Sequence, residues 1–142
     1  MTMDTDSRTV VMEREMAHPP EKVWRALTQS ALVQEWLMTN DFQPVVGHRF
    51  NLRAQPMPQW DGLIDCEVLT IKPCAALSYT WNTASGGMKT VVSWTLTSTA
   101  KGTLVRMEQS GFRPEEENNY QGAKYGWPRF ITALEQMVSL LD

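Results

Sequence analysis

Cysteine and histidine are scarce in this chain of 142 residues, which carries two of each. Cys66 and Cys74 form no C-x-x-C pair, and His18 and His48 stand at unrelated positions. A structural zinc site needs four closely spaced thiol or imidazole ligands, so the sequence argues against one. Two reduced thiols are the expected state of the cysteines, and neither a metal nor another cofactor is indicated.

Long apolar runs and clusters of one charge are also absent from the sequence. The first residues, MTMDTDSRTV, lack the apolar segment of a signal peptide, and no run approaches the roughly 18 to 20 apolar residues that span a bilayer. The net charge is -3 and the basic residues are scattered, whereas a nucleic-acid or anionic-membrane surface needs a clustered positive patch. We therefore expect a cytoplasmic protein with no nucleic-acid partner and no membrane insertion.

The chain does have a globular composition. Apolar residues make up 42% of it and charged residues 20%, and the length suits one domain with a substantial core. We expect a flexible N-terminal tail over residues 1–8 and a single domain over residues 9–142.

Apolar and polar residues alternate with a period of two over several segments, as in strands with one covered and one solvated face. Short turns such as Lys101-Gly102 between neighbouring segments predict an antiparallel meander. Gly86-Gly87 predicts another hairpin turn and not a phosphate loop, because no Lys-Ser or Lys-Thr follows in P-loop spacing. The predicted strands lie at residues 9–17, 48–54, 62–71, 77–81, 92–97 and 105–109.

Helical patterning surrounds these strands. Pro20 opens a short helix over residues 21–28, and Ser30 is the predicted N-cap of a second short helix over residues 31–37. A long terminal helix begins at Arg113, and it must bury its apolar stripe against the covered face of the sheet. The order of elements predicts an α+β fold in which a bent antiparallel sheet of about six strands wraps the long helix. The stripe consists of Trp127, Ile131, Leu134, Val138 and Leu141.

No set of residues in the sequence has the pattern of a catalytic centre. A histidine base needs a nucleophile and an orienting partner, and neither His18 nor His48 has one in sequence. Asp65 and Glu67 alternate with apolar neighbours and are expected on a solvated face.

The strongest functional signal in the sequence is its aromatic residues. The chain has six tryptophans, and the stretch 36–50, WLMTNDFQPVVGHRF, runs from a predicted helix into a predicted strand. Tryptophan fills cores as well as ligand cavities, so both roles stay open at this point.

Seven segments in the same order resemble the START-like, helix-grip superfamily, also called polyketide cyclase or Bet v-like. Within it they are most similar to the group named for the activator of the ninety-kilodalton heat-shock chaperone ATPase. The resemblance implies a curved antiparallel sheet wrapped around a long C-terminal helix, with two short helices after the first strand. The segments are HPPEKVWRALT (18–28), EWLMTNDFQPVVGHRF (35–50), WDGLIDCEVLTIKP (60–73), LSYTW (77–81), SWTL (93–96), GTLVRMEQSGF (102–112) and YGW (125–127).

The resemblance also implies a cavity between the sheet and the terminal helix that admits a small hydrophobic ligand. Fold membership alone does not fix the function. The residues that match lining positions of the family are Trp36, Phe42, Phe50, Trp60, Ile64, Cys66, Tyr79, Trp81, Trp94, Met107, Gln109, Tyr120 and Trp127.

Binding of a lipid-like or aromatic molecule in this cavity is therefore the leading hypothesis, and we expect a binding protein rather than an enzyme. One alternative is a cavity enzyme of the cyclase or hydrolase type, for which Tyr79, Gln109 and Cys66 are the main inward candidates. Another alternative is a co-chaperone-like module that stimulates a heat-shock chaperone ATPase. A homodimer through an open sheet edge is a further hypothesis about partners.

Overall fold

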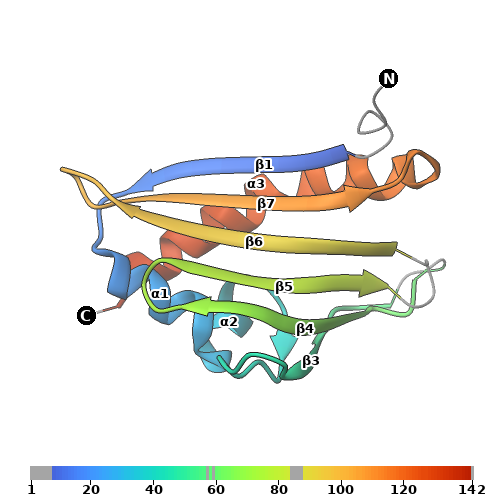
Figure 1. Ribbon diagram of the computed structural model, residues 1–142, viewed down its shortest axis with the longest axis horizontal. Helices are drawn as coiled ribbons and strands as arrows, with labels where there is room; N and C mark the ends of the chain where they lie inside the picture. Colours follow the sequence, from blue (N-terminus) through green and yellow to red (C-terminus); the bar gives the residue numbers. More distant parts are fainter. Residues whose placement is uncertain (1–7, 57, 59, 84–87, 142) are drawn as a thin grey trace.

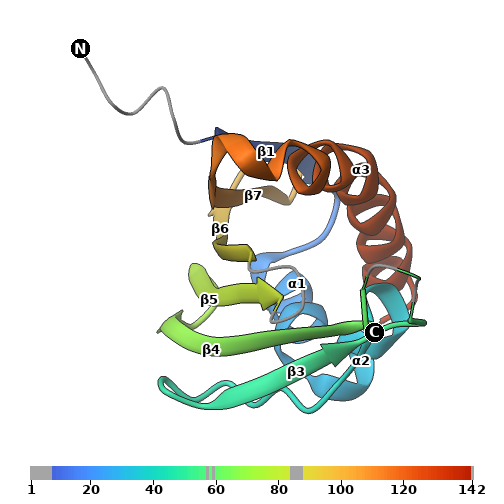
Figure 2. The ribbon, with the colours of Figure 1, turned by 90° about the vertical axis from the view of Figure 1, so that its right-hand side faces the viewer.

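The computed structural model describes residues 8–56, 58, 60–83 and 88–141. The chain forms a seven-stranded antiparallel sheet, two short helices after the first strand and a long C-terminal helix, as Figure 1 shows. Figure 2 shows that the sheet is strongly curved and that the long helix lies across its open side. The predicted α+β helix-grip fold is confirmed.

The strands follow the order β1-β7-β6-β5-β4-β3-β2 in the sheet, and each neighbouring pair is antiparallel. Arg8 was predicted to belong to the N-terminal tail, but it begins β1. Residues 1–7 lie outside the described residues. The predicted Gly86-Gly87 turn between β5 and β6 lies outside them as well. The strands are β1 (Arg8–Met16), β2 (Thr39–Asn40), β3 (Arg49–Arg53), β4 (Leu63–Lys72), β5 (Ala76–Thr83), β6 (Met88–Ser98) and β7 (Thr103–Phe112).

The strand that the sequence does not predict is β2, which lies in the expected loop after the second helix. Its two residues pair with Leu52 and Arg53 of β3. The buried side chain of Asn40 organises this segment, because its Oδ1 accepts hydrogen bonds from the Phe42 backbone N–H at 3.0 Å and from the Ser30 hydroxyl at 2.8 Å. A buried amide therefore fixes a loop that its local sequence leaves undefined.

The two short helices are α1 (Pro20–Thr28) and α2 (Ser30–Trp36). The prediction that a proline opens α1 is confirmed, because Pro20 occupies the first turn, where the missing N–H has no helical partner to lose. The predicted N-cap of α2 is wrong. Gln29 is the N-cap, and the hydroxyl of Ser30 donates instead to Oδ1 of Asn40.

The terminal helix α3 (Glu117–Ser139) follows a single turn of 3-10 helix, η2 (Pro114–Glu116). Pro128 lies inside α3 without ending it. The predicted apolar stripe is confirmed over the helix, and its last member follows the end of α3 and is half-buried. The buried members are Trp127, Ile131, Leu134 and Val138.

The two halves of α3 differ in how closely they are packed. Buried positions begin at Trp127 and recur to Val138, and the helix contacts β1, α1 and α2. Earlier in the helix, Asn118, Asn119 and Gly122 are exposed. Figure 1 places α1 and α2 at the end of the sheet where α3 ends, so this end is well filled. The second half of α3 therefore anchors the helix, and the first half borders the open end.

Gly62 and Gly47 both have a positive φ, but only Gly62 lies close to another part of the chain. Alanine substitutions at the two positions therefore separate the cost of backbone strain from the cost of a steric clash. Gly62 has φ +82° and Gly47 has φ +89°, but a Cβ at Gly62 would collide with the carbonyl oxygen of Ala54, whereas nothing lies within 4 Å of one at Gly47. We expect Gly62→Ala to lower the free energy of unfolding by about 2–4 kcal/mol and Gly47→Ala by about 1 kcal/mol, measured by urea denaturation. Equal losses would contradict the close approach of the chain at Gly62.

Candidate functional site

A cavity of about 540 Å³ lies between the first half of α3 and the concave face of the sheet. This volume is within the range of small-molecule sites in proteins. The sheet contributes residues of β4, β5, β6 and β7. The described residues that border the cavity are Met38, Trp60, Ile64, Trp81, Thr83, Met88, Gln109, Phe112, Asn118, Asn119, Gly122, Ala123, Tyr125, Gly126, Trp127 and Phe130.

Aromatic and aliphatic side chains form most of the cavity wall. Trp81 of β5 and Trp127 of α3 are both buried, and their ring centroids lie 5.3 Å apart with the planes inclined at 54°. Phe130 adds a third ring, whose centroid lies 5.4 Å from that of Trp127. Ile64 and Met88 contribute further apolar surface from the sheet. Such a wall favours a flat apolar guest, because both partners then lose contact with water.

The most deeply buried polar group of the wall is the side-chain amide of Gln109 on β7, which is 1% exposed. Its Oε1 accepts a hydrogen bond from Nε1 of Trp127 at 2.7 Å, and its Nε2 donates to the hydroxyl of Thr90 at 2.9 Å. That hydroxyl donates in turn to the backbone carbonyl of Trp81 at 2.6 Å. This hydrogen-bonded chain ties α3 to β7, β6 and β5.

Two glycines keep the cavity-facing surface of α3 bare. A Cβ at Gly122 would meet no atom within 4 Å, and a Cβ at Gly126 would approach only the ring of Phe130, at 3.9 Å. Close packing therefore does not require glycine at either position, although each glycine costs roughly 0.5–1 kcal/mol of helix stability relative to alanine. The volume that their missing side chains leave belongs to the cavity.

The rim of the cavity is more polar than its floor. On α3 it carries the exposed residues Asn118, Asn119 and Tyr125. Away from α3 it is formed by the half-buried Met38 and Trp60. An apolar interior with a few polar groups near the mouth is the usual construction of a site for a small molecule.

The structure brings five of the lining residues implied by the family resemblance together at the cavity. They are Trp60, Ile64, Trp81, Gln109 and Trp127.

The other implied residues do not border the cavity. Tyr120 of α3 is half-buried, with its ring centroid 5.6 Å from that of Phe112 and the guanidinium of Arg8 over its face. The remaining seven residues are buried in the core. They are Trp36, Phe42, Phe50, Cys66, Tyr79, Trp94 and Met107.

The aromatic members of this core form one packed cluster beside the cavity. Phe50 lies between Phe42 and Tyr79, with centroid distances of 5.0 and 5.6 Å and edge-to-face geometry. Nε1 of Trp94 donates to the Tyr79 hydroxyl at 3.0 Å, so both polar groups have partners inside the cluster. The ring of Trp94 also lies 5.8 Å from that of Trp127, so the cluster supports the cavity wall from behind.

Sequence reasoning missed several residues that border the cavity, and Phe112 shows why. Strand alternation through Val105 and Gln109 places residue 111 inward and Phe112 outward. Gly111 instead adopts φ +101°, and the pairing of β1 with β7 shifts register beside it, which turns Phe112 into the interior. A glycine within a predicted strand is the available signal of such a bulge. The other missed residues are Met38, Thr83, Met88, Asn118, Asn119, Gly122, Ala123, Tyr125, Gly126 and Phe130.

The inward ionisable side chains are poorly suited to catalysis. Burial raises the pKa of the Cys66 thiol far above its ordinary value of 9.0, and the charges of Asp65 and Asp41 raise it further. Burial also raises the pKa of Tyr79 far above its ordinary value of 10.0, although the hydrogen bond from Trp94 opposes the shift. Both groups are neutral at physiological pH, and neither borders the cavity.

The histidines lie away from the cavity as well. Nε2 of His48 lies 3.0 Å from the backbone oxygen of Asp41. Nδ1 of His18 lies 3.4 Å from Nζ of Lys22. Within the described part of the chain, no three His, Cys, Asp or Glu side chains gather closely enough to hold a metal ion.

None of the helices described here is long and apolar enough to cross a membrane.

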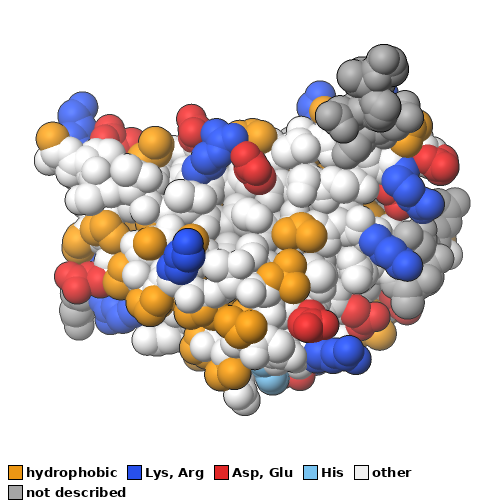
Figure 3. Space-filling view, viewed as in Figure 1, with side chains coloured by type: hydrophobic (Ala, Val, Ile, Leu, Met, Phe, Trp, Pro, Cys, Tyr) orange, Lys and Arg blue, Asp and Glu red, His pale blue; other side chains and the backbone are white. Residues whose placement is uncertain are grey.

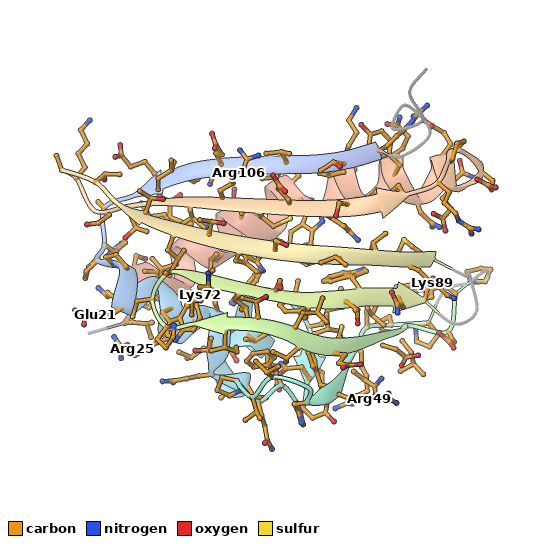
Figure 4. The ribbon with its side chains drawn as sticks, in the orientation of Figure 1. Glu21, Arg25, Arg49, Lys72, Lys89 and Arg106 are labelled. Atoms are coloured by element: carbon orange, nitrogen blue, oxygen red, sulfur yellow. The ribbon has the colours of Figure 1, made fainter. Side chains whose placement is uncertain are left out.

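A second hollow, of about 490 Å³, lies on the outer face of the sheet and has polar surroundings. Arg49 and Glu67 border it and form an ion pair at 3.7 Å. Figure 3 shows charged side chains of both signs spread over this face. Figure 4 shows Lys72, Lys89 and Arg106 well apart, on three different strands. The outer face therefore has the character of a solvated surface.

A family model described as Activator of Hsp90 ATPase homolog 1-like protein matches residues 17–139, which is most of the chain. No curated protein is similar enough to count as a match.

Several solved structures share the fold. Protein MLL2253 from Mesorhizobium loti is 55% identical, with a TM-score of 0.89, and the match covers 95% of this chain and 99% of that one. Protein BH1534 from Bacillus halodurans is 26% identical, with a TM-score of 0.78 and coverage of 92% and 96%. CalU16 from Micromonospora echinospora is 19% identical, with a TM-score of 0.77 and coverage of 94% and 78%, which is a likeness of fold alone.

The raised pKa values of Cys66 and Tyr79 predict a loss of stability in alkali. The native state holds both protons more tightly than the unfolded chain, so their contribution is complete below about pH 9 and is lost as the pH rises through and above the ordinary pKa values of 9.0 and 10.0. The free energy of unfolding should fall there by up to about 1.4 kcal/mol per pH unit for each group.

Urea denaturation from about pH 8 to about pH 11 measures this fall. In Tyr79→Phe the free energy of unfolding should fall less steeply with pH above about pH 10 than in the wild type, because only the Cys66 thiol of the two groups then remains to lose a proton on unfolding. Tyr125→Phe alters an exposed side chain and is the matched control, which should keep the wild-type decline. The same slope in Tyr79→Phe as in the wild type would contradict the burial of the Tyr79 hydroxyl.

Proposed function

This chain belongs to the family described as Activator of Hsp90 ATPase homolog 1-like protein, and we propose that it binds a small, flat and largely apolar molecule in the cavity beneath the first half of α3. The fold of this family often binds hydrophobic ligands. The observation that carries the proposal is the wall itself, in which the buried indoles of Trp81 and Trp127 adjoin open space together with one buried amide.

Burial of apolar surface is the driving force that this wall provides. Each 100 Å² of apolar surface removed from water favours binding by about 2.5 kcal/mol, before the cost of ordering the two partners. The ordering cost on the protein side is reduced, because hydrogen bonds within the protein hold Trp127 to Gln109 and the backbone of Trp81 to Thr90. A preformed wall of this kind suits a rigid ring system better than a long flexible chain.

The enzyme alternative draws little support from the described residues. Of its three candidates, Gln109 alone borders the cavity, and an amide neither gives up nor takes up a proton at physiological pH. The co-chaperone alternative rests on the family name, and the homodimer alternative rests on β1 and β2 being edge strands of the sheet.

Gly122→Trp tests the proposal by filling the cavity from the helix. The variant should lower the affinity for N-phenyl-1-naphthylamine, an uncharged probe that fluoresces in apolar surroundings, by about tenfold or more. The helix should tolerate the change, since glycine is the weaker helix former and nothing lies within 4 Å of a Cβ there. Fluorescence titration gives the affinity, and circular dichroism and thermal melting report the fold.

Gln136→Trp is the matched control, because it adds the same side chain to an exposed position of α3 outside the cavity. It should keep the wild-type affinity. A wild-type protein that does not enhance the probe's fluorescence, or a Gly122→Trp variant that binds the probe as tightly as the wild type, would contradict the proposed function.

A further inference from the structure

We propose that the side-chain amide of Gln109 is the polar anchor of the site and that the ligand carries an uncharged hydrogen-bond acceptor, such as a ketone, quinone or amide carbonyl, on its flat apolar body. The inference rests on the proposed binding function and makes the class of ligand more specific. It follows from the orientation of the amide, from the hydrogen-bonding capacity that remains to it and from the absence of charge among the described residues of the wall.

The orientation of the amide is determined by its two partners. An indole N–H can only donate, so the group that faces Nε1 of Trp127 at 2.7 Å must be the Oε1 oxygen of Gln109. The hydroxyl of Thr90 donates its hydrogen to the backbone carbonyl of Trp81, which leaves its oxygen to accept from Nε2 of Gln109. The two contacts agree, so the amide cannot flip without breaking both hydrogen bonds.

One N–H of Gln109 remains without an acceptor among the described residues. The Nε2 group carries two hydrogens, and Thr90 accepts one of them. The side chain is 1% exposed, and it borders the cavity. A buried donor left without a partner is unfavourable, whereas an acceptor on a bound molecule would restore the missing hydrogen bond. A hydrocarbon ligand would make the apolar contacts but could not accept this hydrogen bond.

The acceptor has to be uncharged. The described residues of the cavity wall include no Lys, Arg, His, Asp or Glu, so a charged group of the ligand would lose its hydration without gaining a counterion. Of the cationic side chains labelled on strands in Figure 4, those on β3, β4 and β6 are exposed. Arg106 on β7 is half-buried and forms ion pairs with Glu13 and Glu108. A neutral carbonyl accepts from an amide N–H and costs far less to desolvate than a charged group, which fits both conditions.

The two tryptophans that border the cavity together with the amide favour a planar body for the same ligand. Trp127 donates its indole N–H to Gln109 while its ring borders the cavity, and the ring of Trp81 lies 5.3 Å from it. A flat ring system can therefore contact indole surface while its carbonyl reaches the amide. The cavity differs from a wholly apolar one, because a hydrogen bond to Gln109 would fix the orientation of the bound ligand.

A matched pair of probes tests the anchor in the wild-type protein. 2-Acetylnaphthalene and 2-ethylnaphthalene have similar size and shape, but only the first has a carbonyl. We expect isothermal titration calorimetry to show the ketone binding about tenfold more tightly, the effect of one well-formed buried hydrogen bond. Equal affinities would overturn the anchor and leave the proposed function standing, whereas binding of neither probe would overturn both.

Two variants identify the group responsible. Gln109→Met keeps the length of the side chain without its amide, and it should bind both naphthalenes with nearly equal affinity. Gln136→Met makes the same change at an exposed position of α3 outside the cavity and should keep the full preference for the ketone. A preference that survives in Gln109→Met, or that disappears in Gln136→Met, would overturn the assignment to Gln109.

A measurement on the wild-type chain decides the question if Gln109→Met does not fold. In a nitrogen-15 NMR spectrum, the side-chain NH₂ signals of Gln109 should move downfield when the ketone binds and much less when the hydrocarbon binds. A purely structural amide, which only holds Trp127 and Thr90 in place, would respond alike to both probes. Equal shifts of the Gln109 signals with the two probes would contradict the proposed role of Gln109, even if both probes bind.

Discussion

The hydrogen bond from Trp127 to Gln109 joins the long helix to the sheet at the edge of the cavity, and the orientation of the buried amide in the site depends on it. After Trp127 the stripe of α3 packs down to Val138, whereas before it the helix borders a cavity. The same indole joins the aromatic core through Trp94 and the cavity wall through Trp81. Trp127 therefore marks the boundary between the filled and the hollow parts of the interior.

The division of the aromatic residues follows from this boundary. Rings near the well-filled end of the sheet meet one another edge to face, and the pair formed by Tyr79 and Trp94 satisfies its own polar groups. Rings under the first half of α3 have protein on one side and the cavity on the other. Gly122 and Gly126 extend that free surface, because neither position is required to be glycine by close packing. The fold is thus stabilised by one part of the aromatic set while the other part is available to a guest.

Much of the fold could be predicted because its signals are local. Alternation gave the long strands, Pro20 gave the start of α1, and the stripe gave the buried face of α3. The short strand β2 could not be predicted, since it depends on Asn40 accepting a hydrogen bond from Ser30, ten residues away in the chain. The N-cap of α2 was wrong for the same reason, because the hydroxyl of Ser30 is used in that contact.

The site could be predicted only in part, because alternation reports the direction of a side chain and not what it meets. Trp81 and Trp94 both point inward, yet one borders the cavity and the other is enclosed by the core. The difference depends on where α3 crosses the sheet, which no local pattern records. The bulge at Gly111 reverses the expected direction of Phe112, and the glycines on the cavity side of α3 have no side chains that would indicate a site.

A crystal structure of the protein soaked with N-phenyl-1-naphthylamine tests the central claim most directly. The proposed site requires electron density for the probe beside the indoles of Trp81 and Trp127. A cavity filled by protein side chains, or a probe bound elsewhere, would contradict it.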